Sequence, residues 1–306
     1  MTFIPDPTLK PGEKARWSPA SRFIESTLRE IKAQSDFITK VQQENGKASH
    51  MKGKKTIALC NDRTFYTIQG EAPFIGIPAV FLRLTSCNLK CTWCDTPYTW
   101  QPDKLEINKE PIDEVAAEIA MLLVNNQCNL LVITGGEPLL QKKALAQLIK
   151  KVVYLRADDP STFLTPPMTV QFETNGTVAP FTQGEEDEIF ADDSDSGFWY
   201  VVSPKHFVDG NQELKAQMHD KFEDMLDEGD SITIKVVHEP NSKPCMEYIA
   251  EIAEWGPWRR QWVYLMPEGW TFEPKAYEQT AELAMKIRVN MSPRLHTLAW
   301  GDKRGV

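Results

Sequence analysis

Three of the six cysteines in the chain lie within eight positions of one another. Cys87, Cys91 and Cys94 follow the spacing C-x3-C-x2-C in the stretch "SCNLKCTWCDTPYTW". Three thiolates on one short loop can hold three corners of a soft metal site. Zinc in a structural site takes a fourth protein ligand, and iron–sulfur clusters also usually take four cysteines. A three-cysteine cluster leaves one iron open to a substrate or cofactor, so the spacing favours a catalytic iron site.

Two other interpretations of these cysteines stay open at this stage. A zinc knuckle completed by a distant residue, or a set of reduced surface thiols, would also fit the spacing. None of the five histidines is a sequence neighbour of the loop: they are His50, His206, His219, His238 and His296. The remaining cysteines, Cys60, Cys128 and Cys245, are isolated and are interpreted as thiols packed like small hydrophobic residues.

The elements that must position the cysteine loop alternate between short apolar runs and helix-like segments. Strands are predicted at 79–84, 130–134, 168–173, 198–203, 232–237 and 262–266. Helices are predicted at 112–125, 139–153, 211–227 and 244–255. Nearly continuous apolar strands separated by crossover helices indicate a parallel sheet that is buried on both faces. The expected fold is α/β, a partial (βα)6-type barrel, with a doubly wound open sheet as the alternative.

Two kinds of segment fall outside this alternation. Residues 1–53 are predicted to form an N-terminal extension with an amphipathic helix, capped by Ser18, and a linker to a core domain at 54–306. The segments 156–168 and 182–197 are rich in turn-forming and acidic residues. Both are interpreted as surface insertions, and the second is expected to be mobile.

The composition is that of an ordinary soluble globular protein. The 306 residues are 42% hydrophobic and 25% charged, which is enough apolar material for one large core. No apolar run approaches the roughly 18–20 residues that span a bilayer, and the N-terminus lacks an apolar signal segment. The net charge of −9 argues against direct binding to nucleic acid, which requires a basic face. A cytoplasmic protein without membrane association is therefore expected.

Longer motifs around the cysteines carry a family resemblance. The stretch "TIQGEAPFIGIPAVFLRLTSCNLKCTWCDT" is followed in order by "TGGEPLL", "ETNGT", "VSPK" and a late "RLH". C-x3-C-x2-C after a first strand is the signature of radical S-adenosylmethionine (SAM) enzymes. More narrowly, the motifs over residues 60–300 resemble those of the 7-carboxy-7-deazaguanine synthases. The resemblance implies a [4Fe–4S] cluster, SAM and Mg²⁺ as cofactors.

The resemblance also implies which residues hold these cofactors. The catalytic group would be Cys87, Cys91 and Cys94 on the cluster, whose open iron is chelated by SAM, with the Thr96 hydroxyl on Mg²⁺. The residues expected to contact SAM are Trp93, Asp95, Gly135, Gly136, Glu137, Ser203, Pro204, Lys205, Met266, Pro267, Glu268 and Gly269. The alternative explanations are structural: the glycine loop would be a strand-end turn, Lys205 a surface lysine, and Ser203 and Thr96 capping residues.

A third set of residues is implied to bind the substrate: Ile68, Gln69, Gly70, Glu71, Arg83, Thr134, Glu173 and His296. Glutamine and glutamate complement the alternating donors and acceptors of a pterin edge, and Arg83 offers a planar fork to a carboxylate. Because Arg83 lies inside an apolar strand, it must face a polar pocket or a partner. A structural ion pair with Glu71 or Glu173 is the alternative for Arg83, and simple packing is the alternative for His296.

The activity that the resemblance implies is that of a radical SAM lyase. Such an enzyme converts 6-carboxy-5,6,7,8-tetrahydropterin to 7-carboxy-7-deazaguanine and ammonia in queuosine-type deazapurine biosynthesis, and recycles its SAM. An external one-electron donor and a homodimeric assembly are also implied. Two alternatives remain: a glycyl-radical-enzyme activase, which shares the cysteine spacing but acts on a protein, and a non-catalytic zinc-binding interaction module.

Overall fold

The structure of the chain is a computed structural model that describes residues 54–91, 94–157, 167–191, 193, 195–205, 218–269, 271–301 and 303–305. The predicted N-terminal extension with its helix and Trp93 lie outside these ranges. The strands are β1 (Thr56–Ile68), β2 (Pro78–Leu84), β3 (Asn108–Pro111), β4 (Leu130–Gly135), β5 (Thr169–Thr174), β6 (Gly197–Val202), β7 (Ile232–His238), β8 (Val263–Pro267) and β9 (Asn290–Met291). The helices are α2 (Ile112–Asn125), α3 (Lys142–Ala157), α4 (Gln183–Ile189), α5 (Asp220–Glu228), α6 (Lys243–Ala253), α7 (Pro257–Arg260), α8 (Pro274–Ile287) and α9 (Leu295–Trp300), with 3-10 turns η1 (Pro97–Thr99) and η2 (Pro138–Gln141).

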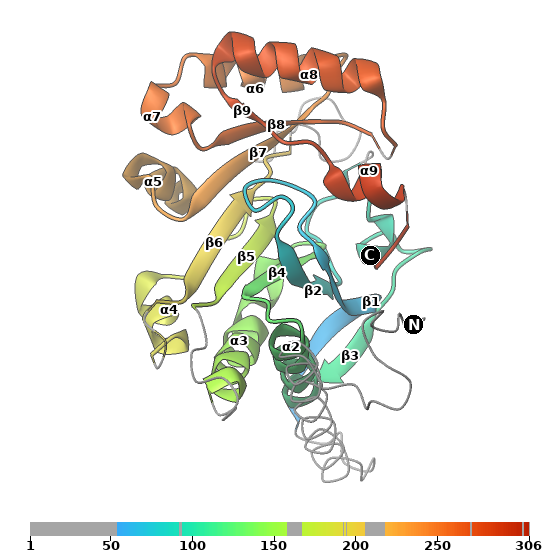
Figure 1. Ribbon diagram of the computed structural model, residues 1–306, viewed down its shortest axis with the longest axis vertical. Helices are drawn as coiled ribbons and strands as arrows, with labels where there is room; N and C mark the ends of the chain where they lie inside the picture. The colour runs from blue at the N-terminus through green and yellow to red at the C-terminus, as the bar shows by residue number, and fades with distance from the viewer. Residues whose placement is uncertain are drawn as a thin grey trace, which may run out of the picture. The chain divides into compact units, whose positions relative to one another are not determined.

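All the described strands join one sheet, in the order β3-β1-β2-β4-β5-β6-β7-β8-β9 (Figure 1). From β2 through β4 to β9, each strand runs parallel to its neighbour, whereas β1 is antiparallel to both β2 and β3. The six predicted strands correspond to β2 and β4–β8, so the parallel α/β prediction is confirmed. The strand order never reverses along the parallel part, and a doubly wound sheet requires such a reversal. The arrangement is that of a partial barrel.

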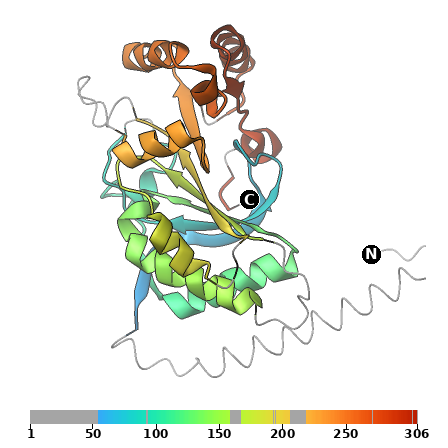
Figure 2. The ribbon, with the colours of Figure 1, turned by 90° about the vertical axis from the view of Figure 1, so that its left-hand side faces the viewer.

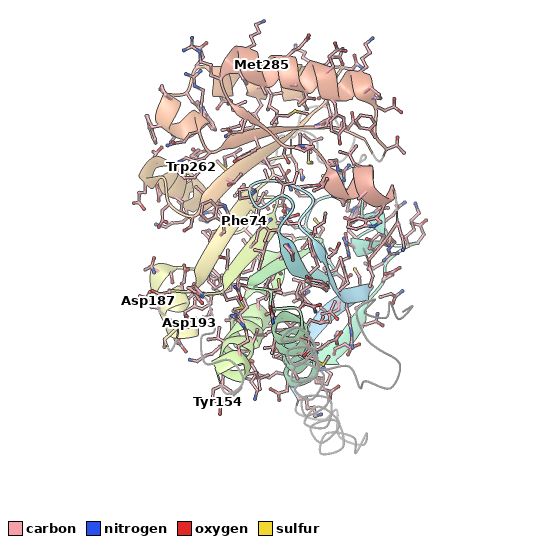
Figure 3. The ribbon with its side chains drawn as sticks, viewed as in Figure 1. Phe74, Tyr154, Asp187, Asp193, Trp262 and Met285 are labelled. Carbon is pink, nitrogen blue, oxygen red and sulfur yellow. The ribbon has the colours of Figure 1, made fainter. Side chains whose placement is uncertain are left out.

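The crossover helices bury their apolar faces against one side of this sheet. In α2 the buried Ile119 and Leu123 recur at helical spacing, and in α3 Leu145 and Ile149 do the same. Figure 2 shows α2 and α3 on the outer side of the sheet, away from α9 and the β1–β2 loop. Outward-facing side chains such as Met285 on α8, which is 72% exposed, project into solvent (Figure 3). The inner side of the sheet is therefore left to the polar residues described below.

Part of the acidic segment 182–197 is a capped helix and not a mobile loop. At the start of α4, Thr182 and Glu185 form a capping box, in which each side chain accepts a hydrogen bond from the backbone N–H of the other. Ile189 and Phe190 are buried in the core. The expectation of mobility is therefore wrong for the described part of this segment. The T-x-x-E signature of a helix start is present in the sequence, within the run of acids.

The sequence analysis also did not predict strands β1, β3 and β9 or helices α7, α8 and α9. Strand β1 carries an irregularity between Leu59 and Thr64, which interrupts the alternation that marks a regular strand. Strand β9 has only two residues, too few for a periodic pattern. Among the described helices, none is long and apolar enough to cross a membrane.

Candidate active site

A pocket of about 550 Å³ lies at the C-terminal ends of the parallel strands, where barrel enzymes carry their active sites. Most of the predicted site residues line it: Ile68, Gln69, Gly70, Glu71, Arg83, Cys87, Cys91, Cys94, Asp95, Thr96, Thr134, Gly135, Gly136, Glu173, Ser203, Lys205, Met266, Glu268, Gly269 and His296. Glu137, Pro204 and Pro267 are buried close by but do not form its wall. The structure thus brings together, from six strands and α9, residues that the sequence spreads over more than two hundred positions.

The cysteine loop leaves the end of β2 and is tied back to it. Ser86 adopts a left-handed φ of 77°, and its backbone N–H donates to the carbonyl of Thr99 at 2.8 Å. Cys87, Cys91 and Cys94 are free thiols that all line the pocket. Burial raises the pKa of the Cys91 thiol to about 11 and also raises the pKa of the Cys87 thiol. Because metals bind the thiolate form, metal loading must displace these protons.

The donor set, three cysteine thiols on one loop that line a single pocket, fits an iron–sulfur cluster. Within the described ranges, no three His, Cys, Asp or Glu side chains converge closely enough to hold one metal ion. In a cluster each cysteine binds a different iron, so the thiols must share a cavity but need not meet at one point. Asn175 Nδ2 also approaches Cys87 Sγ at 3.9 Å, and hydrogen bonds to sulfur tune such clusters. Cys87, Cys91 and Cys94 are therefore the residues that would hold it.

Two glycines bring the β4 loop into contact with the cysteine loop. A Cβ on Gly135 would lie 2.0 Å from the carbonyl oxygen of Leu84, and a Cβ on Gly136 would lie 2.0 Å from that of Ser86. Gly135 also has a φ of 119°, which side-chain-bearing residues rarely adopt. The close approach leaves backbone, with no side chain in the way, on the pocket wall beside the cysteines. This wall suits a ligand that reaches the open iron.

Glu137 lies behind the pocket wall and not on it. It is fully buried, and its carboxylate accepts hydrogen bonds from the Thr174 hydroxyl at 2.8 Å and the backbone N–H of Asn175 at 2.7 Å. A third bond comes from the N–H of Leu139 at 3.0 Å. Glu137 therefore links the ends of β4 and β5 and positions both loops, and its contact with SAM stays a prediction.

The residues after β6 and β8 face the cysteine loop from the other side. The Ser203 backbone N–H bonds to Thr174, and Lys205 Nζ donates to Ser203 Oγ at 3.0 Å. A hydroxyl and an ammonium group at a strand end can bind the carboxylate or ribose of a nucleoside ligand. Gly269, after β8, has a φ of 125°, and its carbonyl accepts a hydrogen bond from Arg294.

A buried ionic group forms the floor of the pocket. Lys235, in the middle of β7, lies 2.5 Å from Glu71 and 2.6 Å from Glu173. Glu173 also accepts hydrogen bonds from Gln171 at 2.6 Å and Gln69 at 3.4 Å. The Lys235 side chain is only 5% exposed, so the two acids are its compensation for leaving water.

Burial and the surrounding charges together shift the pKa values of Glu71 and Glu173 in opposite directions. Burial by itself raises the pKa of Glu71, but Lys235 and Arg294 together lower it well below its usual range. Burial raises the pKa of Glu173, the negative charge of Glu71 raises it further, and Lys235 offsets only part of this effect. For Lys235, burial favours the neutral amine, but the two acids raise its pKa above the ordinary value. The buried ionic group therefore holds a charged Lys235 and a charged Glu71, and Glu173 is the carboxyl that takes up a proton more readily.

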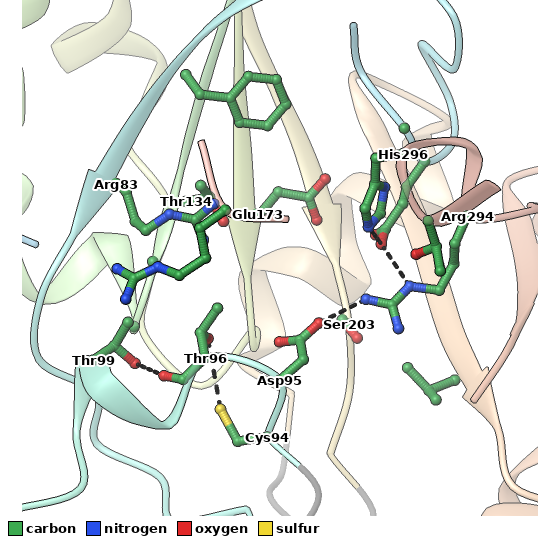
Figure 4. A pocket seen from close by; sticks show the side chains of 18 of the residues that line it. Arg83, Cys94, Asp95, Thr96, Thr99, Thr134, Glu173, Ser203, Arg294 and His296 are labelled. Atoms are coloured by element: carbon green, nitrogen blue, oxygen red, sulfur yellow. Dashed lines mark hydrogen bonds and ion pairs between the residues drawn. The ribbon is translucent and has the colours of Figure 1, made fainter. Parts of the chain in front are cut away.

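Arg294 extends the buried ionic group toward the cysteine loop. Its guanidinium donates to Glu71 at 3.3 Å and to Asp95 at 2.8 Å, so it bridges the floor of the pocket to the residue that follows Cys94 (Figure 4). His296 stands beside it, with Nε2 4.0 Å from Glu71. Burial lowers the pKa of His296, although the Glu71 charge opposes this, so the neutral ring prevails near pH 7.

Arg83 has a different partner from those expected. Its Nε lies 3.2 Å from Asp62 in β1, and within the described residues it forms no ion pair with Glu71 or Glu173. Figure 4 shows Arg83 and Thr134 on one side of Glu173, with Arg294 and His296 on the other. The expectation that Arg83 faces a polar pocket is confirmed, and the alternative of an ion pair with either glutamate is wrong.

Thr96 lines the pocket beside Cys94. It precedes η1 as the N-cap residue, but its side chain makes no capping hydrogen bond there. The Oγ1 atom instead lies 3.6 Å from Cys94 Sγ, and the carbonyl of Thr96 accepts the hydroxyl of Thr99 at 2.8 Å (Figure 4). The alternative of a capping threonine is therefore wrong.

Lys235, Arg294 and Asn175 were missed by the sequence analysis. Lys235 interrupts the apolar run "ITIKVV", which is the same signal that drew attention to Arg83. Arg294 lies in the "RLH" motif and Asn175 in the "ETNGT" motif, so both were within reach of motif analysis. What the sequence could not indicate is that Lys235 and Arg294 share Glu71.

Gly70 makes room for His296, which leads to a testable expectation. A Cβ at this position would lie 2.1 Å from His296 Nδ1 and 2.9 Å from His296 Cβ. Gly70→Ala should displace the histidine ring and lower the free energy of unfolding by about 1–3 kcal/mol, as overpacking does. Denaturant unfolding measures this. Gly184→Ala is the control, because a Cβ there meets nothing within 4 Å, and equal effects at both positions would contradict the expectation.

The fold and the cysteine loop define a radical SAM protein, and a family profile described as "Radical SAM superfamily" matches residues 83–228. A 7-carboxy-7-deazaguanine synthase from Hyperthermus butylicus is 34% identical over 246 residues, which cover 76% of this chain and 89% of that protein. The synthase of the same name from Halobacterium salinarum is 31% identical, over 80% of this chain and 91% of that protein. The chain belongs to the 7-carboxy-7-deazaguanine synthase family.

Among solved structures, the chain is similar to QueE from Escherichia coli, with 21% identity, a TM-score of 0.49, and coverage of 79% of this chain and 95% of that one. Membership of the radical SAM superfamily implies a [4Fe–4S] cluster and SAM. The chain is an enzyme, and neither the activase nor the zinc module is favoured.

Proposed function

We propose that this chain converts 6-carboxy-5,6,7,8-tetrahydropterin to 7-carboxy-7-deazaguanine and ammonia. The reaction balances without an added oxidant, because loss of ammonia alone relates the two compounds. The observation that carries the proposal is that one pocket holds both the three-thiol loop and the polar floor of Glu71, Glu173 and Lys235. Family membership supports the same activity.

Each part of the pocket has a task in this reaction. When bound, the cluster and SAM supply a 5′-deoxyadenosyl radical that removes one hydrogen atom from the substrate. Ser203 and Lys205 suit the polar groups of SAM, and the carboxamide and carboxyl groups of Gln69 and Glu173 suit the donor and acceptor edge of a pterin. Arg83 offers its fork to the pterin carboxylate from the opposite side.

We assign Mg²⁺ to the Thr96 hydroxyl, which is uncapped and lines the pocket beside Cys94. Magnesium keeps several water or substrate oxygens and takes few protein ligands, so a single hydroxyl is sufficient. Thr96→Val should therefore abolish the dependence of turnover on Mg²⁺ and reduce the rate at saturating Mg²⁺ by about 10–100-fold. Thr96→Ser, which keeps the hydroxyl, should retain the dependence. A Mg²⁺ titration of both variants decides this, and an unchanged titration for the valine variant would contradict the assignment.

Several further properties belong to the same proposal. The proposed catalytic unit is residues 54–306, because among the described residues those that line the pocket run from Phe65 to Gly305. We also propose that the enzyme is a cytoplasmic homodimer that receives electrons from an external one-electron donor.

The proposed function is tested by an anaerobic assay of the cluster-loaded chain with SAM, a chemical reductant, Mg²⁺ and the tetrahydropterin. The expected result is formation of 7-carboxy-7-deazaguanine and ammonia, without net consumption of SAM. Cleavage of SAM with no conversion of the pterin would leave a radical SAM enzyme with another substrate. Protein that carries zinc without iron or sulfide would contradict the cluster and the function together.

A further inference from the structure

Residues 303–305, here called the closing segment, form part of the pocket wall, and one arginine docks them there. The Arg304 guanidinium lies 3.6 Å from the centroid of the Tyr98 ring. It also hydrogen bonds to Asp62 at 2.7 Å and to Glu106 at 3.1 Å. Because Tyr98 follows the cysteine loop and lines the pocket, Arg304 connects the closing segment to the edge of the site.

Asp62 is shared by two arginines, and the two contacts differ in kind. Arg304 donates to both of its carboxylate oxygens, through Nη2 at 2.7 Å and Nε at 3.3 Å. Arg83 Nε lies 3.2 Å from one of these oxygens, but the pair is not aligned as a hydrogen bond. The Arg83 Nε is buried and has no hydrogen-bonding partner among the described residues. A buried donor left in this state is costly, so it favours a ligand that supplies an acceptor.

The local charges explain why the Nε donor of Arg83 is left without an acceptor. Arg83 and Arg304 carry two positive charges, and Asp62 and Glu106 carry two negative charges. Both acids hydrogen bond to Arg304. If Arg304 were neutral, Asp62 would have Arg83 as its remaining cation at 3.2 Å. A small rotation of either side chain would then give the charge-assisted hydrogen bond that is absent here.

We propose that Arg304 is a positioning residue for substrate recognition: by occupying Asp62, it keeps the Arg83 guanidinium available for the carboxylate of a heterocyclic substrate. The inference rests on the proposed function, since the pterin is the carboxylate-bearing ligand. Arg304 itself touches neither the cluster nor the reacting atoms. Its effect on binding passes through Asp62 to Arg83.

The test compares two fluorescent, unreactive probes, 6-carboxypterin and pterin, which differ by the carboxylate. Their dissociation constants are measured by anaerobic titration of the cluster-loaded protein with SAM. Arg304→Gln should weaken 6-carboxypterin about tenfold, the cost of one hydrogen bond to a charged group. Pterin, which lacks the carboxylate, should keep its affinity. Equal weakening of both probes would indicate a general disturbance of the pocket wall and overturn the proposal, as would no change in either.

A second substitution separates charge sharing from a structural role. Asp62→Asn in the Arg304→Gln background removes the carboxylate charge that competes with the substrate for Arg83. The affinity for 6-carboxypterin should therefore return to within about twofold of wild type, because the neutral asparagine holds Arg83 only weakly. Absence of this rescue would overturn the proposal. Arg63→Gln is the matched control: Arg63 also pairs with two acids, Glu110 and Glu118, but does not line the pocket. It should leave both affinities unchanged.

A crystal structure of the Arg304→Gln variant gives a readout that needs no ligand. The expected result is an aligned hydrogen bond between Arg83 Nε and Asp62, at about 2.7–3.0 Å. Retention of the unaligned contact would overturn the proposal. If wild-type protein bound neither probe, the proposed function would fail, and this structure would still decide whether Arg304 controls the Asp62–Arg83 contact.

Discussion

Cys91→Ala should remove the iron–sulfur cluster and reduce turnover of the tetrahydropterin to below about 1% of wild type, since even partners of metal ligands contribute 10–100-fold. Cys91 is the middle cysteine of the loop and lines the pocket with Cys87 and Cys94. With three protein ligands and one open iron, loss of any one thiolate leaves two, which is too few to retain a cluster. The measurements are iron and sulfide content, the visible absorbance of the anaerobically purified protein, and product formation.

Cys60→Ala is the matched control for this prediction. Cys60 is fully buried, and its thiol contacts the carbonyl of Leu84 at 3.4 Å, outside the pocket lining. Burial raises its pKa to about 11, so it stays a neutral thiol. The alanine variant should keep its iron, sulfide and activity, at a modest cost in stability. If Cys91→Ala retained a full cluster, or if Cys60→Ala lost it, the assignment of the ligands would be wrong.

Lys235→Met should destabilise the protein by about 3–5 kcal/mol at pH 7, because removal of one partner of a buried ion pair leaves the other uncompensated. Here two acids lose their shared partner, since Glu71 and Glu173 lie 2.5 Å and 2.6 Å from Lys235. The two carboxyls would then repel each other, move apart and no longer present a fixed edge to the substrate. A fall in kcat/KM should accompany the loss of stability measured by anaerobic denaturant unfolding.

The pH dependence of this variant follows from the pKa shifts. Against the effect of burial, Lys235 and Arg294 lower the pKa of Glu71. This group therefore stabilises the fold at pH values above the pKa that it has in the unfolded chain, and the stabilisation is lost as the pH falls toward the lower pKa of the folded state. The pKa of Lys235 is raised, so its own contribution is complete below the ordinary lysine value and is lost only at high pH. The deficit of Lys235→Met should therefore be largest near neutral pH and shrink below about pH 4, where unpaired carboxyls become protonated.

Two further variants make the lysine prediction specific. Glu173→Gln, added to Lys235→Met, removes one of the repelling charges and should recover part of the lost stability. Lys243→Met is the surface control, because Lys243 and its partner Glu247 are 86% and 65% exposed. Such a pair contributes at most about 1 kcal/mol. Equal losses for the two lysines, or no recovery with Glu173→Gln, would show that Lys235 does not hold a buried ionic group.

Several features of this chain could be read from the sequence because their signals are local. Each of the six predicted strands is a short apolar run, and burial on both faces of a parallel sheet requires that pattern. The cysteine loop was also recognisable, since Cys87, Cys91 and Cys94 lie within eight positions of one another. The strands β1 and β3 were missed because polar interruptions and an irregularity hide their period.

The sequence by itself determined the class of the sheet and singled out the cysteine loop and the strand ends that meet in one pocket. Only the tertiary structure decided which charges meet: Arg83 contacts Asp62 and not the glutamates, and Lys235 and Arg294 converge on Glu71. The physical reason is that periodicity and motif spacing act between near neighbours along the chain. Ion pairs depend instead on the curvature of the sheet and the return of the chain through α9 and beyond, which bring together residues up to 242 positions apart.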